Sequence, residues 1–182
     1  MTPDWPRVST ILKDMGLVKP MPEGLPALEW GRARGSAVHA AIALYEAGSL
    51  DPASLHPDVV GCFEGYLRFK LEQEFLPLAV ELPVQHDSLR YRGTLDAHGT
   101  VKGGGTVLVD FKCSKQPDLT ACAYQLAAYG LTFKAPDAPE EQWCVSLRSD
   151  GTYRLWDVWS MKAEEVFMAA VTVWWAQRER NP

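Results

Sequence analysis

The sequence has few of the features that mark secreted or membrane proteins. Its four cysteines include no CxxC pair, and no apolar run approaches the ~20 residues of a membrane-spanning helix. Pro3, Asp4 and Pro6 stand where a signal peptide would need an apolar segment. We therefore expect a reduced, cytoplasmic protein with free thiols, no disulfide framework and no membrane partner.

A basic surplus is also missing, because 18 lysines and arginines face 23 acidic residues and the net charge is −5. This balance argues against a protein that coats nucleic acid through a broad basic surface. It does not exclude an enzyme that holds cations in a carboxylate cluster, because bound metal reverses the local sign of the field. With 182 residues, of which 47% are hydrophobic, the chain has the composition of one globular domain.

The spacing of apolar residues predicts a single α/β (α+β) domain with a mixed central sheet flanked by helices. Residues 1–34 are proline-rich and are expected to form an arm, with one or two helical turns, packed on a domain of residues 35–182. Helical spacing predicts helices over residues 35–47, from residue 57, over 119–131 and over 162–180. Alternating spacing predicts strands over residues 78–84, 90–97, 106–112, 143–147 and 153–158.

The strand over residues 106–112 carries the most informative charges. Its apolar residues predict a buried strand, and alternation places Asp110 and Lys112 on one face, about 6–7 Å apart at ~3.3 Å per residue. Phe111 then points into the opposite packing layer. A carboxylate and an ammonium so placed can hold a metal, orient water and stabilise a charged transition state. The alternative is a simple ion pair at the strand end.

Asp96 ends the preceding strand, which a glycine-rich turn connects to the strand of Asp110 as a hairpin. We expect an ordinary hairpin to bring Asp96 near the beginning of its partner strand and not near Asp110. A looser, parallel or bent pairing would be needed for the two carboxylates to meet. The alternative is that Asp96 is a turn residue.

Two helices supply further candidates. His39 lies among small residues that let its helix approach the sheet, where a neutral imidazole can bind metal; the alternative is a histidine satisfied in the core. Gln125 and Tyr129 lie four residues apart, so they share one helix face and could contact a phosphate or the strand of Asp110. The alternative is an exposed polar face. Further candidate phosphate contacts are Arg32, Arg34, Arg90, Arg92 and Lys115.

Five motifs in order resemble the PD-(D/E)XK nuclease superfamily, within it the branch of RecB-type and CRISPR-associated exonuclease domains. The motifs are Gly35…His39, Glu81, Gly93-Thr94-Leu95-Asp96, Val109-Asp110-Phe111-Lys112 and Gln125…Tyr129. The segment from Pro6 to Leu12 is also similar to the start of such domains in phage proteins. The resemblance covers residues 6–130 and implies a restriction-endonuclease-like core in a protein of phage or bacterial host cells.

The resemblance also implies roles for individual residues. His39, Asp96, Asp110 and the Phe111 carbonyl would be ligands of Mg²⁺ or Mn²⁺, with Glu81 as a further ligand found in part of the family. Lys112 would position the water or stabilise the pentavalent phosphorus, and Gln125 and Tyr129 would support the site and the DNA. The implied activity is hydrolysis of phosphodiester bonds in DNA by metal-activated water, from strand ends as an exonuclease.

One departure from the family concerns iron–sulfur relatives, which have one cysteine before the histidine motif and three near the C-terminus. Here Cys62 follows His39, so no iron–sulfur cluster is expected. The expected partners are DNA, single-stranded or at duplex ends, a separate helicase, recombinase or single-strand-binding protein, and a second copy of the chain. Two alternatives remain: a catalytically inactive DNA-binding or protein-docking module of the same fold, and an RNA-directed nuclease.

Overall fold

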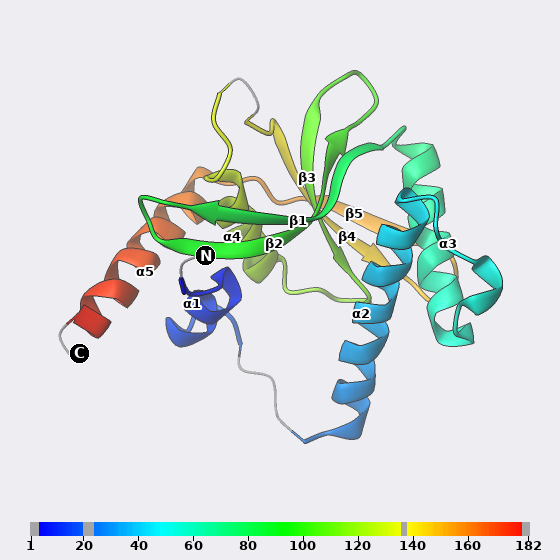
Figure 1. Cartoon of the computed structure of the whole chain (residues 1–182), viewed down its shortest axis with the longest axis horizontal. Helices are drawn as coiled ribbons and strands as arrows, with labels where there is room; N and C mark the ends of the chain where they lie inside the picture. The colour runs from blue at the N-terminus through cyan, green and yellow to red at the C-terminus, as the bar shows by residue number, and fades with distance from the viewer. Residues whose placement is uncertain (1–3, 20–23, 136–137, 180–182) are drawn as a thin grey trace.

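A mixed sheet in the order β1-β2-β3-β4-β5 forms the centre of the chain in a computed structural model, which describes residues 4–19, 24–135 and 138–179 (Figure 1). The neighbouring strands are antiparallel except for β3 and β4, which are parallel. A parallel pair needs a crossover connection, and helix α4 provides it. The strands are β1 (Leu76–His86), β2 (Tyr91–Thr100), β3 (Thr106–Lys112), β4 (Glu141–Leu147) and β5 (Tyr153–Asp157).

Five α-helices of the described chain cover the two faces of this sheet and make it a single α+β domain, as the sequence predicts (Figure 1). One buried cluster joins one face of the sheet to α2 and α3, and another joins the opposite face to α1, α4 and α5. None of the helices in the described part of the chain combines the length and apolarity needed to cross a membrane. The helices are α1 (Val8–Asp14), α2 (Pro26–Glu46), α3 (Pro57–Glu72), α4 (Leu119–Gly130) and α5 (Met161–Glu179), and Pro52–Ser54 forms a 3-10 turn.

The predicted start of the helix over residues 35–47 is wrong, because the corresponding helix α2 begins at Pro26. Its buried residues are Val38, Ala41 and Ile42, all in the last three turns, so the first half has no apolar stripe to reveal it. Proline at the first helical position fits this start. Helix α2 therefore runs through the expected boundary between the arm and the domain at residues 34 and 35.

The β2–β3 hairpin pairs Thr100 with Thr106 and continues in regular register to Ala97 and Val109. The next residues outward on the two strands are Asp96 and Asp110. An ordinary antiparallel hairpin therefore brings the two acidic positions opposite each other. No parallel pairing is needed, because β2 runs on to Thr100, three residues past its predicted end, and so moves the turn away from Asp96.

At one point along β1 and β2, side chains that follow the same alternation pack first into one layer and then into the opposite layer. Val80 and Ala97 pack in the cluster of α2 and α3, whereas Leu82 and Leu95 pack in the opposite cluster, although alternation would put residues two apart on one face. Glu81 lies between them with a φ of 50°, in the left-handed region that a non-glycine residue rarely adopts. The twist places Glu81 and Asp96 at the point where the two packing layers meet.

Candidate active site

Asp96 is held against β3 by its side chain. Its carboxylate Oδ2 accepts a hydrogen bond of 2.8 Å from the backbone amide of Phe111, and the residue is 9% exposed. Burial raises the pKa of Asp96 to about 7, and the negative charge of Asp110 adds to the rise, while the charges of His39 and Lys112 oppose it. The carboxylate of Asp110 thus lies near enough to disfavour the ionisation of Asp96.

Asp110 and Lys112 form an ion pair on the face of β3 that α4 covers. The Lys112 Nζ lies 2.7 Å from the Asp110 carboxylate, whose residue is 1% exposed. Burial alone would lower the pKa of Lys112, but the charges of Asp110 and Asp96 raise it above its ordinary value. Phe111 points into the opposite cluster, so the predicted alternation along β3 is confirmed. Lys112 therefore stays an ammonium beside two carboxylates.

His39 extends from α2 to the same place. Its Nδ1 lies 3.0 Å from Glu81 Oε1 and 3.6 Å from Asp96 Oδ1, and its Nε2 lies 3.1 Å from the carbonyl oxygen of Phe111. Burial alone would lower the pKa of His39, but the hydrogen bond to Glu81 and the charges of Asp96 and Glu81 raise it to about 9. This imidazole is surrounded by acceptors that favour a positive charge.

These contacts define a group of donors that suits a hard divalent cation. Donor atoms of His39, Glu81 and Asp96 lie within 4.8 Å of one another, and the Phe111 carbonyl adjoins them. Carboxylate and carbonyl oxygens with one imidazole match the preferences of Mg²⁺ and Mn²⁺. The residues present therefore fit such an ion. Four of the five predicted metal ligands meet here, whereas Asp110 belongs to a neighbouring group.

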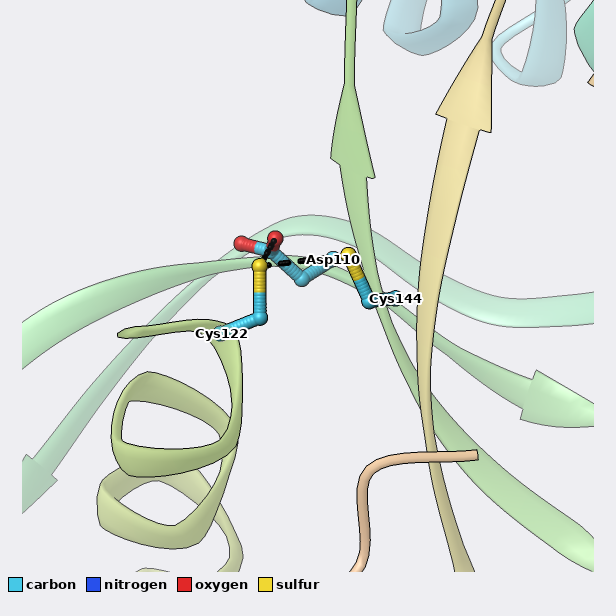
Figure 2. Close-up of side chains that lie close together, drawn as sticks. All are labelled: Asp110, Cys122 and Cys144. Carbon is cyan, nitrogen blue, oxygen red and sulfur yellow. Dashed lines mark hydrogen bonds between the residues drawn. The ribbon is translucent and has the colours of Figure 1, made fainter. Parts of the chain in front are cut away.

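That neighbouring group was not expected from the sequence. Asp110, Cys122 and Cys144 also bring their donor atoms within 4.8 Å of one another, and all three are buried (Figure 2). The cysteines lie 22 residues apart, so their spacing gave no signal. The pairing of β3 with β4 across the α4 crossover could have revealed them, because it sets Asp110 directly opposite Cys144.

Gln125 and Tyr129 lie on the side of α4 that faces β2. Gln125 donates a weak hydrogen bond of 3.4 Å to the Tyr129 hydroxyl, and Tyr129 is 5% exposed. A Cβ atom at Gly93 would stand 2.5 Å from the Tyr129 ring, so the ring can pack here only because position 93 has no side chain. Burial, with the charges of Asp96 and Asp110, raises the pKa of Tyr129 to about 12. Tyr129 is not on an exposed polar face.

A cleft of about 1690 Å³ opens beside this group, with His39, Phe111 and Lys112 in its wall. It lies between α2, the segment after α1 and the segment that connects β3 to α4. Asp118 is the one acidic side chain among the described residues that line it. The basic residues that line it are Lys13, Lys19, Arg32, Arg34, Lys112, Lys115 and Arg148.

Of the predicted phosphate contacts, three line the cleft and two do not. Arg32, Arg34 and Lys115 line it, while Arg90 pairs with Glu179 and Arg92 binds the carbonyl of Trp5. The basic residues missed from the sequence are Lys13, Lys19 and Arg148, none of which lies within one of the five motifs. The chain therefore has a basic concave surface although its net charge is −5.

No protein-family model and no curated protein matches the sequence. Among solved structures, the chain is similar to the alkaline exonuclease LHK-Exo from Laribacter hongkongensis, with a TM-score of 0.51 and 12% identity over 93% of this chain and 76% of that one. It is also similar to LHK-Exo in complex with dAMP, with a TM-score of 0.51 and 14% identity over 97% and 88% of the two chains. At such low identity the similarity shows a shared fold.

Proposed function

We propose that this chain is a metal-dependent nuclease that hydrolyses phosphodiester bonds in DNA. The observation that carries the proposal is the convergence of His39, Glu81 and Asp96 beside the Asp110–Lys112 pair, in the wall of a basic cleft. The five motifs in order and the fold shared with an alkaline exonuclease support placing it in the PD-(D/E)XK superfamily, among the RecB-type exonucleases.

The metal ligands in this proposal are His39, Glu81, Asp96 and the Phe111 carbonyl, with Asp110 beside them. A bound Mg²⁺ or Mn²⁺ supplies a Lewis acid that activates water and offsets the charge of the phosphate. Asp96 is fixed for this role by the Phe111 amide, which leaves its second oxygen facing His39. In the metal-free protein the His39 imidazolium donates from Nδ1 to Glu81 and from Nε2 to the Phe111 carbonyl. To serve as a metal ligand, one of these two nitrogens would have to be unprotonated.

Lys112 acts on the phosphate in this proposal. Its ammonium is anchored by Asp110 and lies in the wall of the cleft, where it can approach the phosphoryl oxygens. A fixed positive charge at that place stabilises the negative charge that develops in the transition state and steadies the attacking water. Because the charges of Asp110 and Asp96 raise its pKa, Lys112 is an ammonium in the metal-free protein.

The cleft supplies the binding surface for the backbone of DNA. Its seven basic residues can neutralise successive phosphates, which gives affinity without base recognition. Gln125 also lines the cleft and supports the site together with Tyr129. We favour cutting from strand ends, because LHK-Exo, whose fold the chain shares, is an exonuclease.

The test uses end-labelled single- and double-stranded DNA and RNA with Mg²⁺ or Mn²⁺. Asp110→Ala and Lys112→Ala should each slow cleavage by on the order of 10³-fold. Lys102→Ala is the matched control, because Lys102 is an exposed lysine that pairs with Glu74 outside the cleft. A closed circular DNA has no ends, so its cleavage would indicate internal cutting and its resistance would indicate cutting from ends.

Each alternative predicts a different result. An inactive DNA-binding or docking module would bind DNA without cleaving it under any metal, and an RNA-directed nuclease would cut the RNA substrates in preference. Cleavage that survives both Asp110→Ala and Lys112→Ala would contradict the assignment of the site.

A further inference from the structure

Asp110, Cys122 and Cys144 place two sulfurs and a carboxylate at one buried point (Figure 2). The Cys122 Sγ lies 3.4 Å from Asp110 Oδ2 and 3.1 Å from the Cys144 Sγ. The three residues are at most 1% exposed. The donors of His39, Glu81 and Asp96 include no sulfur, so this group has a different chemical preference.

The backbone holds the three residues together from three elements. Asp110 and Cys144 are direct partners in the parallel pairing of β3 and β4, so their side chains lie on the same face. Cys122 lies in the first turns of α4, which starts at a cap where Asp118 accepts a hydrogen bond from the Ala121 amide. The cap fixes where α4 begins and so sets Cys122 above β3.

The spacing of these atoms is close to that of a tetrahedral zinc site. With Zn–S of ~2.3 Å and Zn–O of ~2.1 Å, the ligands of such a site stand about 3.6 Å apart for sulfur and oxygen and about 3.8 Å for two sulfurs. The observed 3.4 Å and 3.1 Å need the sulfurs to separate by less than an ångström. Cys122 lines the cleft, which gives a cation a way in.

We propose that Asp110, Cys122 and Cys144 form a second metal site, which takes a thiophilic divalent cation such as Zn²⁺ or Cd²⁺. Binding releases the two thiol protons and joins the metal to two thiolates and one carboxylate. The three negative ligands are balanced by the two charges of the ion and by the Lys112 ammonium, which stays at the Asp110 carboxylate. Soft thiolate donors select these ions over Mg²⁺ and Mn²⁺.

One consequence rests on the proposed nuclease function. Asp110 anchors Lys112 and adjoins the hard-cation ligands, so a soft ion that binds Asp110 changes the charge and position of both. Zn²⁺ or Cd²⁺ should therefore inhibit cleavage even when Mg²⁺ is in excess. A dithiol chelator should restore the activity, because it competes for the soft ion and has little affinity for Mg²⁺.

The test of the site needs no DNA. Reduced protein is titrated with Cd²⁺, and the thiolate-to-metal charge-transfer absorption is followed in the ultraviolet; Co²⁺ is used in parallel for its visible bands. One equivalent should saturate the signal. Cys122→Ser and Cys144→Ser should each weaken binding by about 10- to 100-fold or more, and Asp110→Asn by a smaller factor.

The chain contains a matched control in Cys62 and Cys113, which belong to neither donor group. The Cys62→Ser/Cys113→Ser variant should keep the full signal. Absence of a signal in the natural chain, or its loss in the control variant but not in Cys122→Ser, would overturn the site. Near-ultraviolet circular dichroism shows which variants are folded, and the two single cysteine variants give independent chances of a folded probe. A nuclease assay that fails while the Cd²⁺ signal follows these residues separates this site from the proposed function.

Discussion

The Lys112 ammonium lies 2.7 Å from the Asp110 carboxylate, and both side chains leave β3 on the same face. Asp110 is buried, whereas the Lys112 side chain is about one third exposed. The lysine is therefore the partner through which water and substrate can reach the pair. The same contact makes each residue dependent on the other for stability.

A double-mutant cycle measures that dependence. Lys112→Gln should lower the free energy of unfolding by on the order of 2 kcal/mol, because it leaves the buried Asp110 charge without its partner. Adding Asp110→Asn should recover part of the loss, with a coupling of about 1–2 kcal/mol. Urea unfolding measures all four proteins. Additive losses would show that the pair contributes no coupling.

The stability of the metal-free protein should fall as pH rises. The contacts with Glu81 and Asp96 outweigh burial and raise the pKa of His39 from 6.5 to about 9, so the folded state binds this proton more tightly than the unfolded state. Its stabilisation is complete below pH 6.5 and disappears as the pH passes through about 9. The pKa of Asp96 is also raised, and it acts in the same direction at lower pH.

Urea midpoints in EDTA across this pH range test the effect. His39→Gln should flatten the plot of urea midpoint against pH. His56→Gln, at an exposed histidine before α3, should leave the slope of that plot unchanged. Saturating Mn²⁺ should reverse the trend for the natural chain, because the cation binds the unprotonated ring. An unchanged slope in His39→Gln would assign the pH dependence to other groups.

Glu81 combines a strained backbone with a candidate ligand. Its φ of 50° suits glycine, so Glu81→Gly should be more stable than Glu81→Ala by about 1–2 kcal/mol, since both lose the carboxylate and alanine keeps the strain. Both variants should bind Mn²⁺ more weakly, which calorimetry measures. Glu74 has a φ of 48° outside the site, so Glu74→Gly is the control that leaves Mn²⁺ affinity unchanged. Equal stability of the two Glu81 variants would mean that the backbone stores no strain there.

Gly93 should tolerate no side chain. A Cβ atom would stand 2.5 Å from the Tyr129 ring, so Gly93→Ala should destabilise the protein by about 1–3 kcal/mol and displace the ring from Gln125. Gly31→Ala is the matched control, because nothing beyond its chain neighbours and the backbone of its own helix lies within 4 Å of the added methyl. That helical substitution should stabilise by about 0.5–1 kcal/mol. Thermal melting distinguishes the opposite signs.

The basic cleft should set the salt dependence of DNA binding. Arg32→Ala and Lys115→Ala should each weaken binding to any sequence and reduce the slope of log K against log salt by about 1. Arg154→Ala should change neither quantity, because Arg154 lies over the Trp156 ring and does not line the cleft. Fluorescence anisotropy with a catalytically silenced chain measures both. Identical slopes for all three variants would place the DNA elsewhere.

The sequence predicts the sheet and most helices of this fold because alternation and helical spacing report directly on burial. It also predicts the face shared by Asp110 and Lys112. The start of α2 escapes because its first half packs too little to leave an apolar pattern. The meeting of Asp96 with Asp110 was predictable in principle, since the short turn between Thr100 and Thr106 fixes the register.

Other features depend on tertiary structure that local patterns do not record. The left-handed backbone at Glu81 has no sequence mark, because a glutamate rarely adopts it. Cys122 and Cys144 meet because a helix crosses between parallel strands. Lys13 and Arg148 line the same cleft although they lie far apart along the chain. Distances along the sequence say nothing of such contacts.

The main chain of Phe111 makes two of the bonds on which the site depends: its N–H donates to Asp96 and its carbonyl faces His39. A peptide unit offers these groups whatever side chain it carries, proline apart. Substitutions at position 111 therefore leave the spacing of the Asp96 carboxylate and the His39 imidazole unchanged. Selection on the side chain at this position concerns only its fit in the core. The packing of the α2–α3 layer can therefore change at this position while the distances between His39, Phe111 and Asp96 stay the same.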